Sequence, residues 1–263
     1  MGQEFETLKL SIENGIGRLT LARADKGNPL GPKSGRELLE AAIALDETRD
    51  LRAVLLTAEG KNFCVGGDLG VFVNEDNLSA AVKGMTADYH GAISKLMRME
   101  APIVTAVQGA CAGAGVALAA LGDIVLSGSG SHFTVAYTAI GFSPDGATTY
   151  ILPRVIGLRR FQELLLTNRR VAASEAAQIG LVTDVVEDDQ LAARAEEMVQ
   201  QVAQGPTRAY GAVRKLLLDT FHTPLEAQLE QEARLLSEQC RTEDVKEGVE
   251  AAVGRRRPVF HGR

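Results

Sequence analysis

Two glycine-rich loops are the features that most constrain the fold of this chain. Each lies between an apolar strand pattern and a helix pattern. The first covers residues 60–69 and contains Gly66-Gly67-Asp68, and the second covers residues 107–116 and contains Gly113-Ala114-Gly115. The first N–H groups of a helix have no partner within the helix, and small residues let a ligand approach that backbone closely. Two such loops on neighbouring strands could aim two N–H donors at one oxygen atom. For either loop taken alone, tight packing of a helix on a strand is the simpler explanation.

The pattern around the loops predicts an α/β protein, because strand and helix periodicities alternate over the first two thirds of the chain. Residues 34–37, Ser-Gly-Arg-Glu, have the spacing of a capping box at a helix start. The expected strands cover residues 8–12, 18–23, 53–57, 103–107, 124–126 and 133–135. The expected helices cover residues 34–49, 77–98, 115–122, 159–168, 174–179, 191–203, 207–221, 224–240 and 244–256. We therefore expect an α/β core over residues 1–200 and a C-terminal helical subdomain over residues 201–263.

Composition excludes several classes of partner and cofactor. The net charge of −6 argues against a nucleic-acid surface, which needs clustered Lys and Arg in excess. The three Cys and four His residues lack metal-ligand spacing, so no metal site is expected, and Cys64 and Cys111 read as buried thiols. No apolar run is long enough for a membrane span, and the first residues do not resemble a signal peptide. A cytoplasmic protein is the expectation.

Neither loop has the pattern of a common nucleotide-binding motif. A phosphate-binding loop would end in Gly-Lys followed by Ser or Thr, and neither loop does. The dinucleotide pattern G-x-G-x-x-G with an acidic residue about 20 positions later is also missing. The sequence therefore favours polarisation of a carbonyl oxygen over phosphate binding.

Several ordered motifs together resemble the crotonase, or enoyl-CoA hydratase/isomerase, superfamily. Residues 63–69 are similar to its first oxyanion-hole signature, and residues 109–115 are similar to its second. Residues 139–146 and 152–154 resemble the segment behind the acyl pocket of that family. Residues 163–169, residues 176–186 and the C-terminal residues 256–263 also resemble family segments. The resemblance covers nearly the whole chain.

The resemblance implies a spiral of ββα units with a C-terminal helical oligomerisation subdomain, and a homotrimer or a dimer of trimers. It implies an acyl-CoA thioester as substrate, with coenzyme A entering as part of that substrate and no separate cofactor. The thioester oxygen would bind the N–H groups of Gly67 and Ala114. The residues expected along the CoA arm are Asp25, Lys26, Val65, Gly66, Asp68 and Leu69.

The sequence departs from the family's hydratase pattern at two positions. Hydratases of this family use two glutamates to position and deprotonate water, and the matching positions here hold Ala117 and Tyr137. Neither side chain can serve as a carboxylate acid or base. Hydration by the two-glutamate route is therefore not expected. Tyr137 either lines the acyl pocket or packs in the core.

One carboxylate remains in the same neighbourhood, Asp145 in Ser143-Pro144-Asp145-Gly146. Pro-Asp-Gly is also a strong turn signal, so a turn residue is the alternative. Its position resembles that of the single acid/base aspartate in a subgroup of enoyl-CoA isomerases. Ala136, Ile140, Phe142 and Tyr150 are expected to form an apolar wall beside it. A single carboxylate suits an isomerase, since it could take a proton from C2 and return it to C4.

His90 and Asp145 also resemble residues of the 4-chlorobenzoyl-CoA dehalogenase branch. There the aspartate attacks the aromatic ring and the histidine activates water, but the ring-stacking tryptophan is Tyr137 here. His90 otherwise reads as a surface or packing residue of a helix, and Asp68 as a cap of the next helix. Hydration by another route and a non-catalytic acyl-CoA-binding protein stay open beside the isomerase and the dehalogenase.

Overall fold

The computed structural model describes residues 2–73 and 75–263. Its larger sheet has seven strands in the order β1-β2-β3-β4-β5-β7-β10, and a second sheet has three strands in the order β6-β8-β9. The strands of the larger sheet are β1 (Gly2–Glu4), β2 (Leu8–Glu13), β3 (Ile16–Leu21), β4 (Ala53–Ala58), β5 (Ile103–Val107), β7 (Ile124–Gly128) and β10 (Asp184–Val186). Those of the smaller sheet are β6 (Ala110–Ala112), β8 (His132–Thr134) and β9 (Val171–Ala172).

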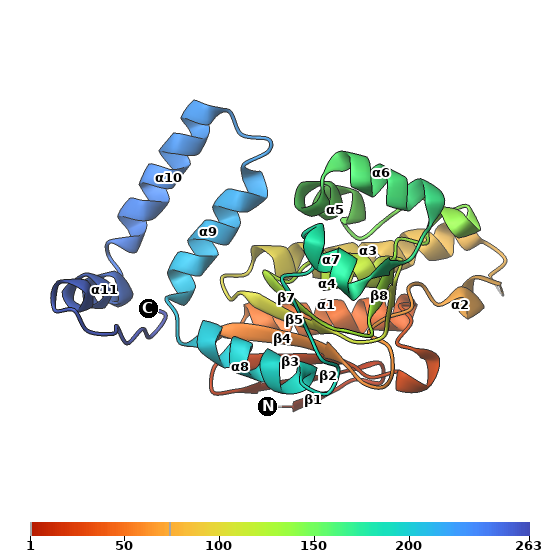
Figure 1. The fold of residues 1–263 in the computed structure, drawn as a ribbon, viewed down its shortest axis with the longest axis horizontal. Helices are drawn as coiled ribbons and strands as arrows, with labels where there is room; N and C mark the ends of the chain where they lie inside the picture. The colour runs from red at the N-terminus through yellow and green to blue at the C-terminus, as the bar shows by residue number, and fades with distance from the viewer. Residues whose placement is uncertain (1, 74) are drawn as a thin grey trace.

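Helices cover both faces of the larger sheet (Figure 1). The core helices and helical turns are η1 (Ala24–Lys26), α1 (Pro32–Asp46), α2 (Leu69–Val73), α3 (Leu78–Arg98), α4 (Ala114–Ala119), η2 (Thr138–Ile140), α5 (Thr148–Ile156), α6 (Leu158–Thr167), α7 (Ala173–Gln178) and α8 (Leu191–Ala203). Strand β4 shows why helices must pack on both faces of the sheet. Val54 and Leu56 pack in the core with α1 and α3, whereas Ala53 and Leu55 pack on the other side with α8. The expected α/β class and the crotonase-type fold are confirmed.

The C-terminal helices form an arm that extends from the sheets (Figure 1). The arm consists of α9 (Thr207–Asp219), α10 (Leu225–Gln239) and α11 (Glu243–Val253). Arg52 ties the chain end to the core, because its NH2 group donates to the carbonyl oxygens of Gly205 at 2.6 Å and Phe260 at 3.3 Å. The division between residues 1–200 and 201–263 falls near the end of α8, and the independence of the two parts stays a prediction.

The predicted capping box at residues 34–37 is wrong. Helix α1 begins at Pro32, so Ser34 lies inside the first turn and its hydroxyl accepts from the N–H of Gly31 at 2.7 Å. Glu37 instead leaves the helix surface to accept from the N–H of Thr7 at 2.8 Å and that of Glu6 at 3.1 Å. Glu37 therefore bonds to residues about 30 positions away instead of capping its own helix, and a local sequence pattern cannot reveal such a contact.

Helix α5 and strands β6 and β10 were not expected from the sequence. Pro153 lies inside α5, and Gly146 and Gly157 flank it, so turn and breaker signals masked the helical pattern. Strands β6 and β10 have only three residues each, which is too short for a periodicity. Their pairing with β8 and β7 defines them instead.

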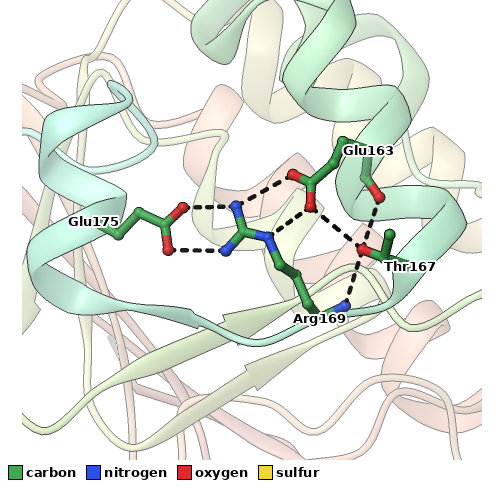
Figure 2. Close-up of polar contacts among 4 residues, drawn as sticks. All are labelled: Glu163, Thr167, Arg169 and Glu175. Carbon is green, nitrogen blue, oxygen red and sulfur yellow. Dashed lines mark hydrogen bonds and ion pairs between the residues drawn. The ribbon is translucent and has the colours of Figure 1, made fainter.

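Arg169 braces the chain where it returns from α6 to the smaller sheet (Figure 2). Its guanidinium group donates to Glu163 at 2.6 Å on α6 and to both carboxylate oxygens of Glu175 on α7, at 2.6 and 2.9 Å. These hydrogen bonds, chiefly those with Glu175, raise the pKa of Arg169, and they lower the pKa of Glu175. The brace fixes both ends of the segment that carries β9, which pairs with β8 beside the second glycine-rich loop.

Candidate active site

The two glycine-rich loops meet at the junction of the two sheets. Cys64 and Cys111 form a parallel β-bridge, in which the N–H of Ala112 donates to the carbonyl of Cys64 at 2.8 Å. The loops touch directly beyond that bridge, since a β carbon at Gly113 would lie 3.6 Å from the Cα of Gly66. The residues that follow, Gly67 and Ala114, line the same cavity.

The backbone leaves the N–H groups of Gly67 and Ala114 available to a ligand. Gly67 forms a bridge with Leu30, in which the carbonyl of Gly66 and the N–H of Asp68 bond to Leu30. The N–H of Gly67 therefore points to the opposite side. Ala114 is the first residue of α4, where an N–H has no acceptor within the helix. Within the described residues, neither N–H group donates to a backbone oxygen outside its own helix or strand.

The cavity beside these groups has a volume of about 630 Å³. It is mostly apolar, with Phe72 and Phe142 in edge-to-face contact at 5.8 Å between ring centres. Ala136, Ile140 and Phe142 form the expected wall, but Tyr150 lines other cavities. The residues that line the first cavity are Leu30, Gly31, Gly35, Val65, Gly66, Gly67, Leu69, Phe72, Val82, Met85, Thr86, Tyr89, Gly113, Ala114, Ala136, Tyr137, Ala139, Ile140, Gly141, Phe142, Ser143 and Asp145.

Asp145 supplies the carboxylate of this cavity, in the turn between η2 and α5. Its Oδ1 accepts from the hydroxyl of Tyr137 at 2.9 Å, and its main-chain carbonyl accepts from the hydroxyl of Thr148 at 2.6 Å. Its side chain is 25% exposed, which leaves it accessible to a substrate. Asp145 therefore lies in a turn, as the Pro-Asp-Gly pattern predicts, and also lines the cavity.

Tyr137 lies between the cavity and the core, so both of its expected settings are present. Burial, and after it the charge of Asp145, raise the pKa of the Tyr137 hydroxyl. The phenol therefore stays protonated and donates to the carboxylate. Ala136, just before it, has a φ of 56°, and Ala147, two residues after Asp145, has a φ of 62°. Non-glycine residues adopt this conformation uncommonly, and strained backbone of this kind clusters at functional sites.

His90 lies on α3 directly behind Asp145. Its Nε2 is 3.5 Å from Oδ2 of Asp145 and accepts from the N–H of Gly146 at 3.1 Å. In this arrangement Nε2 is the acceptor of the Gly146 hydrogen bond and faces the carboxylate of Asp145. His90 does not line the first cavity. It is in contact with the acid/base candidate and also half exposed.

Tyr89 is a site residue that the sequence did not single out. It is buried on α3, lines the cavity and donates from its hydroxyl to the carbonyl of Ala114 at 3.0 Å. Burial raises its pKa well above the ordinary value. In the sequence, Tyr89 has the spacing of a core residue in a long amphipathic helix. Only its hydrogen bond to Ala114 shows that it also fixes the start of α4, which carries one of the two N–H groups.

The hydratase positions hold no carboxylate in the structure either. Ala117 is fully buried on α4 and lies outside the lining of the cavity. The cavity wall at the second position is the ring of Tyr137. Among the described residues that line this cavity, Asp145 is the one carboxylate.

The segments expected along the CoA arm lie side by side. The N–H of Val65 donates to the carbonyl of Gly27 at 3.0 Å, which joins the loop after η1 to the first glycine-rich loop. Val65, Gly66 and Leu69 line the cavity, whereas Asp25, Lys26 and Asp68 do not. Asp68 accepts from NH1 of Arg23 at 2.9 Å, an ion pair that joins the same two segments. Contact with coenzyme A stays a prediction for all six residues.

Cys64 and Cys111 are buried thiols, as expected. Burial raises the pKa of Cys64 to about 12, and it also raises the pKa of Cys111. Among the described residues, no group of three His, Cys, Asp or Glu side chains could hold a metal ion. In the described part of the chain, no helix has both the length and the apolar character to cross a membrane.

A spiral of ββα units with an apolar cavity at the meeting point of two glycine-rich loops defines a crotonase-class protein. A family model for enoyl-CoA hydratase/isomerase matches residues 11–263, and the chain belongs to that family. It is an enzyme of the crotonase superfamily that acts on acyl-CoA thioesters.

Relatives carry more than one activity name. The chain is 34% identical to a "Probable enoyl-CoA hydratase" of Rhodobacter capsulatus, over 98% of this chain and 99% of that protein. It is 31% identical to a 1,2-epoxyphenylacetyl-CoA isomerase of Escherichia coli, over 98% of this chain and all of the relative. The crystal structure of an enoyl-CoA hydratase/isomerase from Cupriavidus metallidurans superposes with a TM-score of 0.90 at 29% identity, covering 99% of this chain and 98% of that one.

Proposed function

We propose that this enzyme moves a carbon–carbon double bond in a 3-enoyl or ring-derived acyl-CoA. The observation that carries the proposal is the site's single carboxylate, Asp145, which lies in a mostly apolar cavity with the N–H groups of Gly67 and Ala114. A hydratase needs groups that position and activate water, and Ala117 and Tyr137 supply no such carboxylates. An isomerase needs one group that removes a proton and returns it elsewhere.

The reaction begins with the thioester oxygen between the two N–H groups. Asp145 takes a proton from C2, the C2–H bond breaks, and its electrons pass through the carbonyl to the oxygen. The two N–H donors stabilise the charge on the resulting dienolate oxygen, because they are already oriented. Asp145 then returns the proton to C4 while the double bond forms between C2 and C3. No atom is gained or lost.

The cavity walls support this assignment. Phe72, Ile140 and Phe142 line the cavity in which the dienolate would form, and their side chains offer water no hydrogen-bond partner. Exclusion of water protects a reactive intermediate and strengthens the donors' effect on the charge. We further propose that the enzyme needs no separate cofactor and that Val65, Gly66 and Leu69 contact the CoA arm, with Asp25, Lys26 and Asp68 near its entrance.

The direct test is Asp145→Asn, which keeps the shape of the side chain and removes the base. Turnover of 3-enoyl-CoA to 2-enoyl-CoA should vanish while acyl-CoA binding, measured by calorimetry, stays nearly intact. Asp189→Asn, an exposed carboxylate in the loop before α8, is the matched control and should keep full activity. Turnover that survives in Asp145→Asn removes this residue from the mechanism.

The two N–H donors are tested separately by Ala114→Pro. Proline lacks the N–H but fits the first position of a helix, so α4 should still form. The rate constant kcat should fall by about 10²–10³, the effect of losing one such donor. A folded variant with wild-type activity would show that the thioester oxygen lies elsewhere.

A dehalogenase-like reaction is the second candidate, and the contact of 3.5 Å between His90 and Asp145 favours it. In that reaction Oδ2 of Asp145 would attack the halogen-bearing aromatic carbon and expel halide to form an aryl ester. His90 would then activate the water that hydrolyses this ester and restores the carboxylate. His90→Gln separates the two: an isomerase tolerates it, whereas the dehalogenase-like enzyme accumulates an aryl ester on Asp145, visible by mass spectrometry of the intact protein.

The two remaining activities give different results in the same assays. Hydration by another route would yield a 3-hydroxyacyl-CoA, which chromatography separates from the isomer. A non-catalytic acyl-CoA-binding protein would bind a broad panel of acyl-CoA esters saturably and convert none. Either result would replace the isomerase proposal.

We also propose that the C-terminal arm joins subunits into a homotrimer or a dimer of trimers. Support comes from large apolar side chains that the arm exposes, Val213, Leu217, Phe221, Leu225, Leu229, Leu236, Val249 and Val253. Exposed apolar surface of this extent is typical of an association surface. Light scattering after size exclusion would give the mass, and a monomer at micromolar concentration would contradict the proposal.

A further inference from the structure

We propose that a second cavity behind Asp145 is a solvent port, and that His90 passes the acid/base proton between Asp145 and the water in that port. The proposal rests on the proposed role of Asp145 as acid/base. The second cavity has a volume of about 470 Å³ and lies between α3, the start of α5 and the end of α9. Its polar lining includes His90, Ser94, Arg98, Asp219 and His222, so it suits water.

Asp145 and His90 lie next to each other and line different cavities. Asp145 lines the first cavity and not the second, and His90 lines the second and not the first. The distance from Oδ2 of Asp145 to Nε2 of His90 is 3.5 Å. The other carboxylate oxygen, Oδ1, is held by Tyr137. The two oxygens of the acid/base thus have different partners, one fixed hydroxyl and one titratable ring.

Nε2 is the ring atom that receives the proton in this relay. It accepts from the N–H of Gly146 at 3.1 Å, so a proton that arrives at Nε2 displaces this hydrogen bond. When Asp145 has taken a proton from C2, that proton moves from Oδ2 to Nε2: the O–H bond breaks, an N–H bond forms, and the N–H of Gly146 gives up Nε2 as its acceptor. The products are a carboxylate and an imidazolium ion in contact, and no electron donor or acceptor is needed.

The imidazolium ion then exchanges its protons with solvent. Half of the His90 side chain is exposed and the ring lines the second cavity, so it can pass a proton to water there. A proton from water returns along the same path to Asp145 and from there to C4. The product therefore carries solvent hydrogen in a share set by the competition between exchange and direct return.

The end of α9 forms one wall of the port and is held in place. The hydroxyl of Tyr150 donates to the carbonyl of Leu218, and the guanidinium of Arg154 lies 3.5 Å from the centre of the Tyr150 ring. Arg154 also bonds His222 at 2.8 Å. These contacts tie α9 to α5, so the port is a walled cavity beside His90.

The experiment runs the reaction on 3-hexenoyl-CoA in D₂O and measures the ratio of deuterated to undeuterated product at C4 by mass spectrometry in the first turnovers. His90→Phe should lower this ratio at least about fivefold. His222→Phe, which removes the other imidazole of the same cavity without touching Asp145, should keep the wild-type ratio. The ratio does not depend on the overall rate, so a slower variant is still informative. Equal ratios in His90→Phe and wild type overturn the proposal.

A second variant guards against misfolding of the first. His90→Gly leaves space beside Asp145, and added imidazole should restore deuterium incorporation towards the wild-type ratio. Failure of imidazole to raise the ratio in folded His90→Gly counts against the relay.

The proposal and the isomerase assignment fail in different ways. Deuterium at C2 of recovered acyl-CoA reports proton exchange even when no double bond moves. Exchange at C2 that depends on His90, without any isomer, supports the port and rejects the isomerase. Formation of the isomer with deuterium incorporation that does not depend on His90 supports the isomerase and rejects the port. If neither the isomer nor exchange at C2 is detected, both proposals are rejected.

Discussion

The hydroxyl of Tyr137 donates to Oδ1 of Asp145 across 2.9 Å, at the boundary between the apolar cavity and the core. The same hydroxyl lies 3.2 Å from that of Thr148, which in turn donates to the main-chain carbonyl of Asp145. By the resemblance of the sequence motifs, the tyrosine stands at a position where hydratases of this family have a glutamate. It orients the carboxylate through Oδ1, whereas Oδ2 faces His90.

Tyr137→Phe should lower kcat by about tenfold or more, because a hydrogen bond to a charged group contributes about 1.5–3 kcal/mol. The KM for the acyl-CoA should change little, since the ring that lines the cavity remains. Steady-state kinetics measure both. Tyr210→Phe, which removes a hydroxyl on α9 outside the cavity, is the control. A wild-type kcat in Tyr137→Phe would show that the hydroxyl does not contribute to catalysis and that Tyr137 has only a packing role.

Gly115→Ala should destabilise the junction of the two loops. A β carbon at Gly115 would lie 2.6 Å from the carbonyl oxygen of Cys64 and 2.7 Å from its Cβ. Overpacking of this kind costs about 1–3 kcal/mol. Gly84→Ala is the matched control, because nothing lies within 4 Å of its β carbon on exposed α3. That change should stabilise the protein by about 0.5–1 kcal/mol. Urea unfolding measures both, and equal midpoints would contradict the packing argument.

Cys240 should react with iodoacetamide at pH 8, whereas Cys64 and Cys111 should not. Burial hides both thiols and raises the pKa of Cys64 to about 12, so about one molecule in 10⁴ carries the thiolate at that pH. Peptide mass spectrometry assigns the modified residue, and unfolding in urea is the positive control for all three. Rapid labelling of native Cys64 would show that the loop junction opens.

The C-terminal tail should loosen in acid. Glu247 accepts from Arg256 and from the N–H of Val259 at 2.9 Å, and these bonds lower its pKa from 4.5 to about 2. A lowered pKa in the folded state stabilises the fold above pH 4.5, and this contribution disappears as the pH falls through about 2. The difference in melting temperature between wild type and Glu247→Gln should therefore shrink from pH 6 to pH 2. A constant difference would contradict this linkage.

The sequence determined the features that depend on neighbours along the chain. Alternation in residues 8–12 and short apolar segments elsewhere predicted β2, β3, β4, β5 and β7, and helical patterns predicted α3, α8 and the arm helices. The glycine-rich loops and Asp145 could be identified because their glycines, turn residues and ordered motifs are local. The same motifs showed that the two positions that resemble the glutamate positions of the family's hydratases hold Ala117 and Tyr137, so neither carries a carboxylate.

Which of these residues contact one another depends on how whole helices and strands pack. Glu37 bonds to Thr7 instead of capping its own helix, Tyr89 holds the carbonyl of Ala114, and His90 lies behind Asp145. Each contact joins residues that are 25 or more positions apart, so its hydrogen bond follows from packing of whole elements, not from local propensity. The two N–H donors were visible in the sequence as glycine-rich loops, and the Cys64–Cys111 bridge between them brought both to one cavity.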